Sequence, residues 1–128
     1  MKVVSTDQCA PPAGHYSQGI VHNGLVYVSG MLAVDPVTGE KRLGSVEEQT
    51  LQALRNVDGV LGAAGSSRGQ VLKCTCYIAD IALWGRVNGV YAEFFGEHRP
   101  ARAVVPTREL HHGFLVEIDC IAAVRETE

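Results

Sequence analysis

The chain has 128 residues, which fits a single domain spanning 1–128 and leaves no room for a second hydrophobic core. Apolar residues make up 46% and charged residues 20%, values near the globular average that exclude intrinsic disorder and fibrous repeats. Asp and Glu number 14 against 11 Lys and Arg, so the chain lacks the cation excess that nucleic-acid partners require.

The first fifteen residues are predicted to be irregular. The prolines in Ala10–Gly14 rule out a helix and limit any strand to the first few residues. Met1–Asp7 lacks the apolar core of a signal peptide, and no apolar run in the chain approaches the roughly 20 residues that cross a bilayer. The sequence therefore predicts a cytoplasmic protein without a membrane partner.

Two apolar runs, 19–22 and 25–29, flank Asn23-Gly24 and predict a β-hairpin, because both central residues of a type I′ turn need positive φ. Asp35–Gly39 is predicted to form a second turn. Beyond this turn the sequence pattern changes from one typical of strands to one typical of a helix.

A helix is predicted from Ser45, where Ser45 and Glu48 form a capping box, to a stop at Gly65. Its apolar positions keep helical spacing: Leu51, Leu54, Val57, Leu61 and Ala64. Gly59 and Gly62 each cost up to about 1 kcal/mol relative to Ala in a helix interior. Packing against a sheet must therefore hold this half of the helix in place.

Residues 70–79 predict a strand, and a second helix follows from a cap at Asp80 to Gly96. The strand should carry four apolar side chains on one face: Leu72, Cys74, Cys76 and Ile78. The last two strands are predicted at 101–105 and 114–124.

The element order β-β-α-β-α-β-β predicts an α+β two-layer sandwich, with one sheet and both helices on one face. Nothing in the chain is left to cover the other sheet face. Since the strands carry apolar residues on both sides, we expect that face to be buried by other subunits of a homo-oligomer.

Metal and nucleotide cofactors are not expected. Cys74 and Cys76 lack CxxC spacing, and all four cysteines, Cys9 and Cys120 included, are interpreted as buried free thiols. His111 and His112 are adjacent, so in an extended segment they point in opposite directions, and no third ligand has useful spacing. No Gly-rich phosphate loop precedes either helix.

Two charged residues lie in apolar strands and are the candidates for chemistry. Arg102 either forms an internal ion pair or binds a substrate carboxylate in bidentate geometry. Glu117 shares a strand face with Asp119 and is a general acid or base with a raised pKa, a solvent-facing charge, or the partner of Arg102.

Three residues near the hairpin are candidates for substrate binding. Tyr16 lies where the irregular segment enters a strand, so its phenol either reaches a pocket or packs. Ser29 hydrogen-bonds its own turn, or Gly30 lets a ligand approach the backbone closely.

The most specific motif of the chain is Arg99-Pro100-Ala101-Arg102 followed by Val116-Glu117-Ile118. It occurs together with the segments Gly14–Gly19, Val28–Gly30, Glu48–Thr50, Ala63–Ser67, Val87-Asn88 and Tyr91–Phe95. This combination resembles the reactive-intermediate deaminase (RidA, formerly YjgF) family, in register from about Ala10 to Val124.

The resemblance implies a chorismate-mutase-like fold, a homotrimer with sites between subunits, and cofactor-free hydrolysis of enamines and imines. The substrates would be of the 2-aminoacrylate or 2-iminobutanoate type, and the products 2-keto acids and ammonia. By the same resemblance, Arg102 grips the substrate carboxylate, Glu117 positions or activates water, and Tyr16 and Ser29 line the site.

Three departures from the family pattern lie near the expected pocket: His15, Val104 and the segment 106–113. These departures are compatible with an alternative function, a pathway-specific deaminase of the aminoacrylate or aminomuconate type. A non-catalytic trimer that binds carboxylates or acts like a chaperone is another alternative. The acidic composition argues against a third, ribonuclease or translation inhibition.

Overall fold

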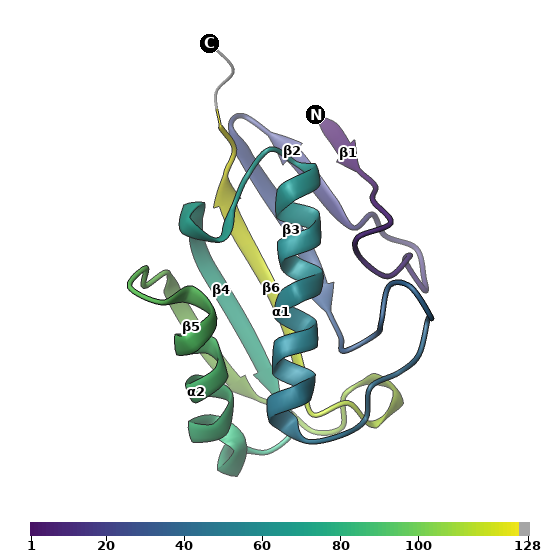
Figure 1. The fold of residues 1–128 in the computed structure, drawn as a ribbon, viewed down its shortest axis with the longest axis vertical. Coiled ribbons are helices and arrows are strands. Elements are labelled where there is room, and N and C mark those ends of the chain that lie inside the picture. The colour runs from purple at the N-terminus through teal and green to yellow at the C-terminus, as the bar shows by residue number, and fades with distance from the viewer. Residues whose placement is uncertain (126–128) are drawn as a thin grey trace.

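The computed structural model describes residues 1–125 and has one six-stranded sheet with two helices on the same face (Figure 1). The strands are β1 (Lys2–Val4), β2 (Gly19–His22), β3 (Leu25–Met31), β4 (Val71–Ile78), β5 (Ala101–Pro106) and β6 (Val116–Ala123). The helices are α1 (Val46–Ala63) and α2 (Trp84–Phe95), and 3-10 turns occur at Arg68–Gln70, Ile81–Leu83 and His111–Gly113. The predicted α+β sandwich is confirmed.

The strand order is β1-β2-β3-β6-β4-β5, and β4 and β5 are the one parallel pair among the described strands. The C-terminal strand β6 is thus central, with β3 on one side and β4 on the other. Within residues 1–125, no helix is both long and apolar enough to span a bilayer.

Local signals placed two features correctly. Asn23 and Gly24 have φ of 50° and 77°, as the hairpin turn between β2 and β3 requires. Ser45 caps α1, and its hydroxyl accepts a hydrogen bond from the Glu48 N–H at 3.2 Å. Within the described chain, the Ser45 N–H does not donate the reciprocal hydrogen bond to the Glu48 carboxylate, so only half of the predicted capping box is formed.

Three details differ from the sequence-based expectation. Lys2–Val4 forms an additional strand that pairs with β2, so the order is β-β-β-α-β-α-β-β. Asp80 caps the 3-10 turn before α2, where its carboxylate accepts from the Ala82 N–H at 2.8 Å. Leu72 is 49% exposed, because a β-bulge between Val71 and Lys73 turns Val71 into the core in its place.

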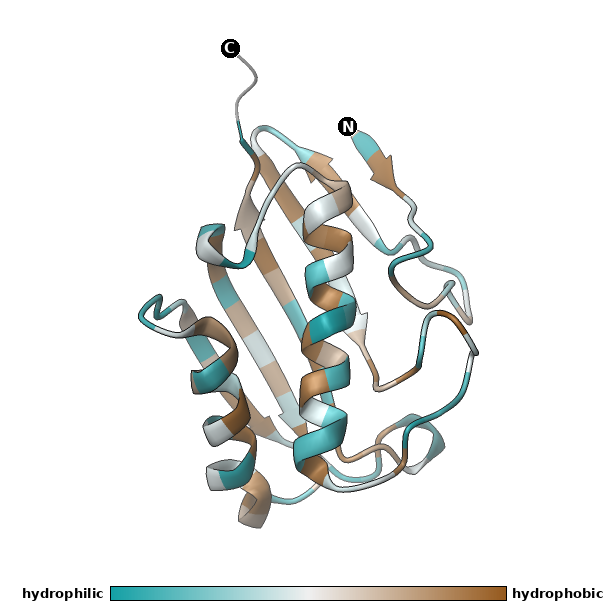
Figure 2. Cartoon of the chain, in the orientation of Figure 1, coloured by the Kyte–Doolittle hydropathy of each residue, from teal (hydrophilic) through white to brown (hydrophobic). Residues whose placement is uncertain are grey.

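The hydrophobic core lies between the sheet and the two helices, where Figure 2 shows apolar residues on the strands and on the helix sides that face them. Cys74, Cys76 and Cys120 lie in this core, as free and buried thiols, and Cys9 is also free and buried. The interpretation of the cysteines as small buried hydrophobes is confirmed.

No helix covers the second face of the sheet in the described chain (Figure 1). Tyr27 on β3 is 45% exposed and Val105 on β5 is 37% exposed. Strand alternation and register add four polar side chains on this face: Thr75, Tyr77, Glu117 and Asp119. The same face is therefore part apolar and part polar.

The two internal glycines of α1 make a matched test of packing. A Cβ at Gly59 would clash with the backbone oxygen of Gln8, whereas a Cβ at Gly62 would meet no atom within 4 Å. We expect Gly59→Ala to destabilise the protein by about 1–3 kcal/mol through overpacking. Gly62→Ala should stabilise it by about 0.5–1 kcal/mol through helix propensity. Urea unfolding of the two variants measures both values, and equal effects would contradict this account of Gly59.

Candidate functional site

Arg102 lies near the start of the edge strand β5 and points to the helix-covered side of the sheet. Its register partner on β4 is the buried Cys74. Its Nη1 donates a hydrogen bond to Asn88 Oδ1 at 2.9 Å. The guanidinium carbon lies 4.7 Å from the ring centre of Tyr91 and 5.4 Å from that of Trp84. Arg102 is thus held by an amide oxygen and two aromatic faces of α2.

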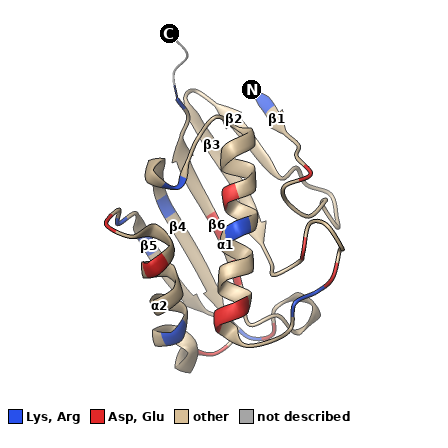
Figure 3. Cartoon of the chain, in the orientation of Figure 1, with Lys and Arg blue, Asp and Glu red and all other residues tan. Residues whose placement is uncertain are grey.

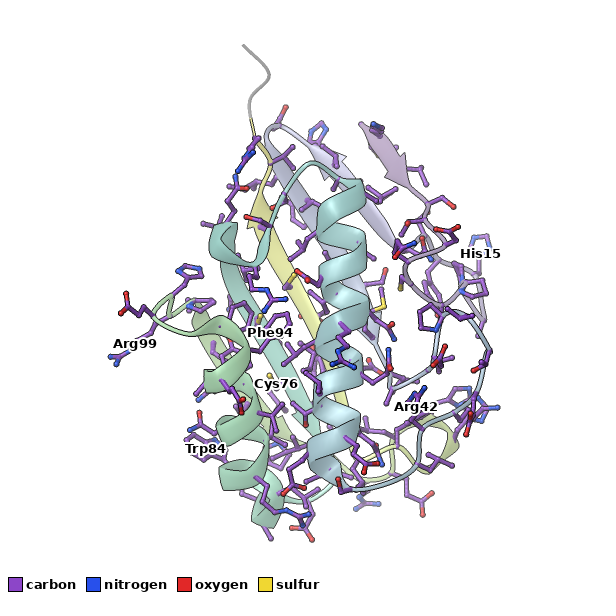
Figure 4. All side chains as sticks on the ribbon, viewed as in Figure 1. His15, Arg42, Cys76, Trp84, Phe94 and Arg99 are labelled. Atoms are coloured by element: carbon purple, nitrogen blue, oxygen red, sulfur yellow. The ribbon has the colours of Figure 1, made fainter. Side chains whose placement is uncertain are left out.

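The residues that hold Arg102 share one face of α2, because Trp84, Asn88 and Tyr91 are spaced i, i+4 and i+7. Trp84 is the first residue of the helix (Figure 4). Within residues 1–125, Arg102 forms no ion pair with a carboxylate, so the internal ion pair considered from the sequence is wrong. The remaining guanidinium N–H groups are not hydrogen-bonded to described residues, and they suit an external carboxylate.

Glu117 lies on β6 and faces the side of the sheet away from the helices. Its carboxylate occupies the space that a side chain at Gly30 would fill. Burial raises the pKa of Glu117, Asp119 raises it further, and the positive charge of His111 partly offsets this. No residue of the described chain donates a hydrogen bond to this carboxylate. Glu117 is therefore placed to exchange a proton with a bound water or substrate.

Asp119 differs from Glu117 although both lie on the same face. Its Oδ2 accepts a hydrogen bond from the Tyr77 hydroxyl at 3.4 Å. Burial raises the pKa of Asp119, and the bond from Tyr77 opposes that shift. Asp119 is thus partly occupied by a protein donor, whereas Glu117 remains open to a ligand.

Arg102 and Glu117 do not meet within one chain. They face opposite sides of the sheet, and two strand spacings separate β5 from β6. Tyr77 on β4 pairs with Glu117 on one side and with Val105 on the other. Glu117 therefore lies opposite Val105, which is three residues beyond Arg102 on β5. Standard strand dimensions put their Cα atoms about 14 Å apart. A small substrate cannot touch both side chains of the same copy, and the two cannot form an ion pair within it.

Tyr16 and Gly30 border a cavity of about 410 Å³ on the Glu117 side of the site. Tyr16 is half exposed, and its hydroxyl accepts a hydrogen bond from the Ala13 N–H at 3.2 Å. Ser29, the third predicted binding residue, does not line this cavity but directly precedes Gly30, which does. Its hydroxyl donates to the Ser17 carbonyl at 2.5 Å, which fixes the loop that carries Tyr16 to the end of β3.

The segment before β6 closes the same cavity with two histidines. The rings of His111 and His112 have centres 3.7 Å apart, and His112 has a φ of 57°. The expectation that they point in opposite directions is wrong, because His111–Gly113 forms a 3-10 turn and not an extended segment. Within residues 1–125, no three His, Cys, Asp or Glu side chains gather as a metal site would require.

A family model described as endoribonuclease L-PSP matches residues 7–124. The chain belongs to this family. Its relatives include a RutC family protein of Pyrococcus horikoshii, 40% identical over 94% of this chain and 96% of the relative. Another is a 2-iminobutanoate/2-iminopropanoate deaminase of Rattus norvegicus, 39% identical over 94% of this chain and 88% of the relative.

The crystal structure of Escherichia coli TdcF with bound serine superposes with a TM-score of 0.92 at 34% identity, covering 98% of this chain and 100% of that one. The resemblance to the RidA/YjgF family drawn from the motifs is thereby confirmed. The match spans the whole sandwich, including the strands that carry Arg102 and Glu117.

Sequence reasoning missed the residues that hold Arg102. Asn88 and Tyr91 entered only as parts of the matching segments Val87-Asn88 and Tyr91–Phe95, and Trp84 was not singled out. The i, i+4, i+7 spacing of Trp84, Asn88 and Tyr91 was the available signal. It indicates a shared helix face, but it does not say that this face meets β5.

Proposed function

We propose that this RidA-family protein hydrolyses enamines and imines of 2-keto acids to the keto acid and ammonia. The observation that carries the proposal is the Arg102 guanidinium, held by Asn88 and aromatic rings at a sheet edge with donors left for a carboxylate. The deaminase name of the rat relative and the serine bound to TdcF support a small amino-acid-like substrate.

The site requires two copies of the chain. Since Arg102 and Glu117 face opposite sides of the sheet, a substrate that uses both must lie between one copy and the next. The uncovered sheet face, with exposed Tyr27 and Val105, supplies a surface for such association. We propose a homotrimer, in which each interface joins Arg102 of one subunit to Glu117 of its neighbour.

The mechanism follows from these groups. Arg102 binds the substrate carboxylate and thereby holds the imine carbon close to Glu117. Catalysis then gains from the proximity and orientation of the reacting groups. The ionised Glu117 accepts a proton from water as the water oxygen bonds to the imine carbon. Glu117 returns this proton to the nitrogen, which gives a carbinolamine. The carbinolamine hydroxyl then passes its proton to the nitrogen through Glu117 as the C–N bond breaks, so that the C=O bond of the keto acid forms and ammonia leaves. An enamine substrate is first protonated at carbon, which converts it into the iminium form, and then follows the same steps. These steps consume one water and need no redox partner.

RNA cleavage, which the family description names, fits the surface less well. The chain has a net charge of −3, and Figure 3 shows Lys and Arg interspersed with Asp and Glu. The three described ion pairs each use an arginine: Arg42 with Asp35, Arg68 with Asp58 and Arg86 with Glu47. Phosphate neutralisation needs unpaired cations on one surface.

An amino-acid oxidase that forms the imine from 2-aminobutyrate in situ gives the direct test. The protein should accelerate ammonia and 2-oxobutanoate release above the spontaneous rate in proportion to its concentration. A rate that stays at the spontaneous value over a hundredfold range of protein concentration would rule out the proposed activity.

A further inference from the structure

The cavity next to Glu117 has polar groups that the proposed reaction does not use. Most of its lining is apolar, including Pro11, Met31, Leu32 and Val34. The amides that line it are satisfied internally: Asn56 donates to the Leu32 and Val34 carbonyls, and Gln18 donates to those of Thr6, Cys9 and Ala10. The polar groups left for a ligand are therefore Tyr16, Lys41, His111 and His112.

Lys41, His111 and His112 form a basic group at this cavity. In the described chain, these three side chains make neither a hydrogen bond nor an ion pair with the protein. Burial lowers the pKa of His112, and the charges of His111 and Lys41 lower it further, which shows that the three side chains interact electrostatically. A neutral imidazole still donates through one ring N–H, so together with the Lys41 ammonium the group favours an anion.

The backbone supports a functional reading of this group. His112 is one of two non-glycine residues with positive φ among residues 1–125, the other being Asn23 in the hairpin turn. Asn23 forms the chain reversal of the hairpin. The conformation of His112 instead places its ring beside the cavity and against that of His111, with ring centres 3.7 Å apart and an angle of 46° between the ring planes. Backbone held in a sparsely populated region is often part of a ligand site.

We propose that Lys41, His111 and His112 bind a second acidic group at the far end of the substrate, so that the preferred substrate is an imino or enamino dicarboxylate. This inference rests on the proposed function, with Glu117 acting at the near end beside Gly30. The size of the cavity agrees, because about 410 Å³ lies in the range of sites for ligands larger than a four-carbon imine. Among the described residues that line the cavity there is no Asp or Glu, and the nearest carboxylate identified, Glu117, lies at the Gly30 end, away from the proposed second subsite.

The test compares kcat/KM for two imines formed in situ, one from 2-aminobutyrate and one from glutamate. The wild-type protein should favour the glutamate-derived imine. The double variant Lys41→Ala/His112→Asn should lower the ratio of the two kcat/KM values about tenfold or more. Asparagine suits the positive φ of position 112 but removes the imidazole. His15→Asn is the matched control, because His15 is exposed, projects from the neighbouring loop (Figure 4) and does not line the cavity.

The outcomes separate the two proposals. If both imines are hydrolysed and the double variant leaves their ratio unchanged, the second subsite is wrong and the deaminase stands. If neither imine is accelerated, the deaminase is wrong, and calorimetry with 2-oxoglutarate and 2-oxobutanoate decides on the subsite. Tighter binding of 2-oxoglutarate that the double variant loses would support the subsite. Equal binding of the two keto acids would overturn it.

Discussion

Arg102→Ala should lower kcat/KM for imine hydrolysis about a hundredfold or more while the protein remains folded. Each hydrogen bond to a charged group contributes about 1.5–3 kcal/mol, and the variant removes a two-pronged contact with the substrate carboxylate. Arg102→Lys should recover part of the loss, because an ammonium keeps the charge but not the fork of donors. Steady-state ammonia release measures the effect, and calorimetry with 2-oxobutanoate should show the matching loss of binding.

Arg99 provides the control for this prediction. It belongs to the same Arg-Pro-Ala-Arg motif, but it is exposed and projects away from the body of the protein (Figure 4). Arg99→Ala should therefore keep wild-type activity. If Arg99→Ala and Arg102→Ala behave alike, then Arg102 does not bind the substrate.

Glu117→Gln should lower kcat about 10²- to 10⁴-fold, the usual contribution of a general acid or base. In the wild type, Glu117 must be ionised to accept a proton from water. Since burial and Asp119 raise its pKa, activity should fall on acidification at a pH above the ordinary range of a glutamate. The residual activity of Glu117→Gln should lack this acid limb, which a pH–rate profile measures.

Asp119→Asn is the matched control on the same sheet face. Removal of the Asp119 charge takes away one cause of the raised pKa of Glu117, so the acid limb should move to lower pH while the rate at neutral pH is largely kept. An acid limb that persists in Glu117→Gln would assign the titration to another group and contradict the role given to Glu117.

The same pKa shift has a consequence for stability. A carboxyl group with a raised pKa binds more protons in the folded than in the unfolded state, so stability falls as pH rises through the interval between the two values. Above that interval the full cost of the buried charge is present. Glu117→Gln should consequently have a higher Tm than the wild type at pH 7, and this advantage should disappear near pH 4.

The elements that local patterns define were predictable from the sequence. Asn23-Gly24 specifies its turn through backbone preference, and Ser45 marks the start of α1 through its hydroxyl. Leu72 was misplaced because a one-residue bulge leaves no trace in a run of apolar residues and changes the face of one side chain. The turn at His111–Gly113 was missed because the left-handed backbone conformation of His112 is uncommon for a residue other than glycine.

The candidate site was predictable in its residues but not in its arrangement. Alternation within a strand predicts that Glu117 and Asp119 lie on the same face of the sheet. It does not predict whether Arg102, on another strand, lies on that face or on the opposite one. That relation depends on β6 entering between β3 and β4, with β5 parallel to β4 at the edge. Pairing between segments distant in sequence therefore decides that Arg102 and Glu117 face opposite sides.

Mixed oligomers of Arg102→Ala and Glu117→Gln test the shared site most directly. Each variant alone lacks one half of every site, but in a mixed ring an interface between two different mutant copies can contain intact Arg102 and Glu117. Random assembly of equal amounts, by co-refolding, should restore about a quarter of the wild-type activity per site, because one interface in four has this combination. Activity no higher than that of the two variants measured separately, in oligomers shown to be mixed, would contradict a site shared between subunits.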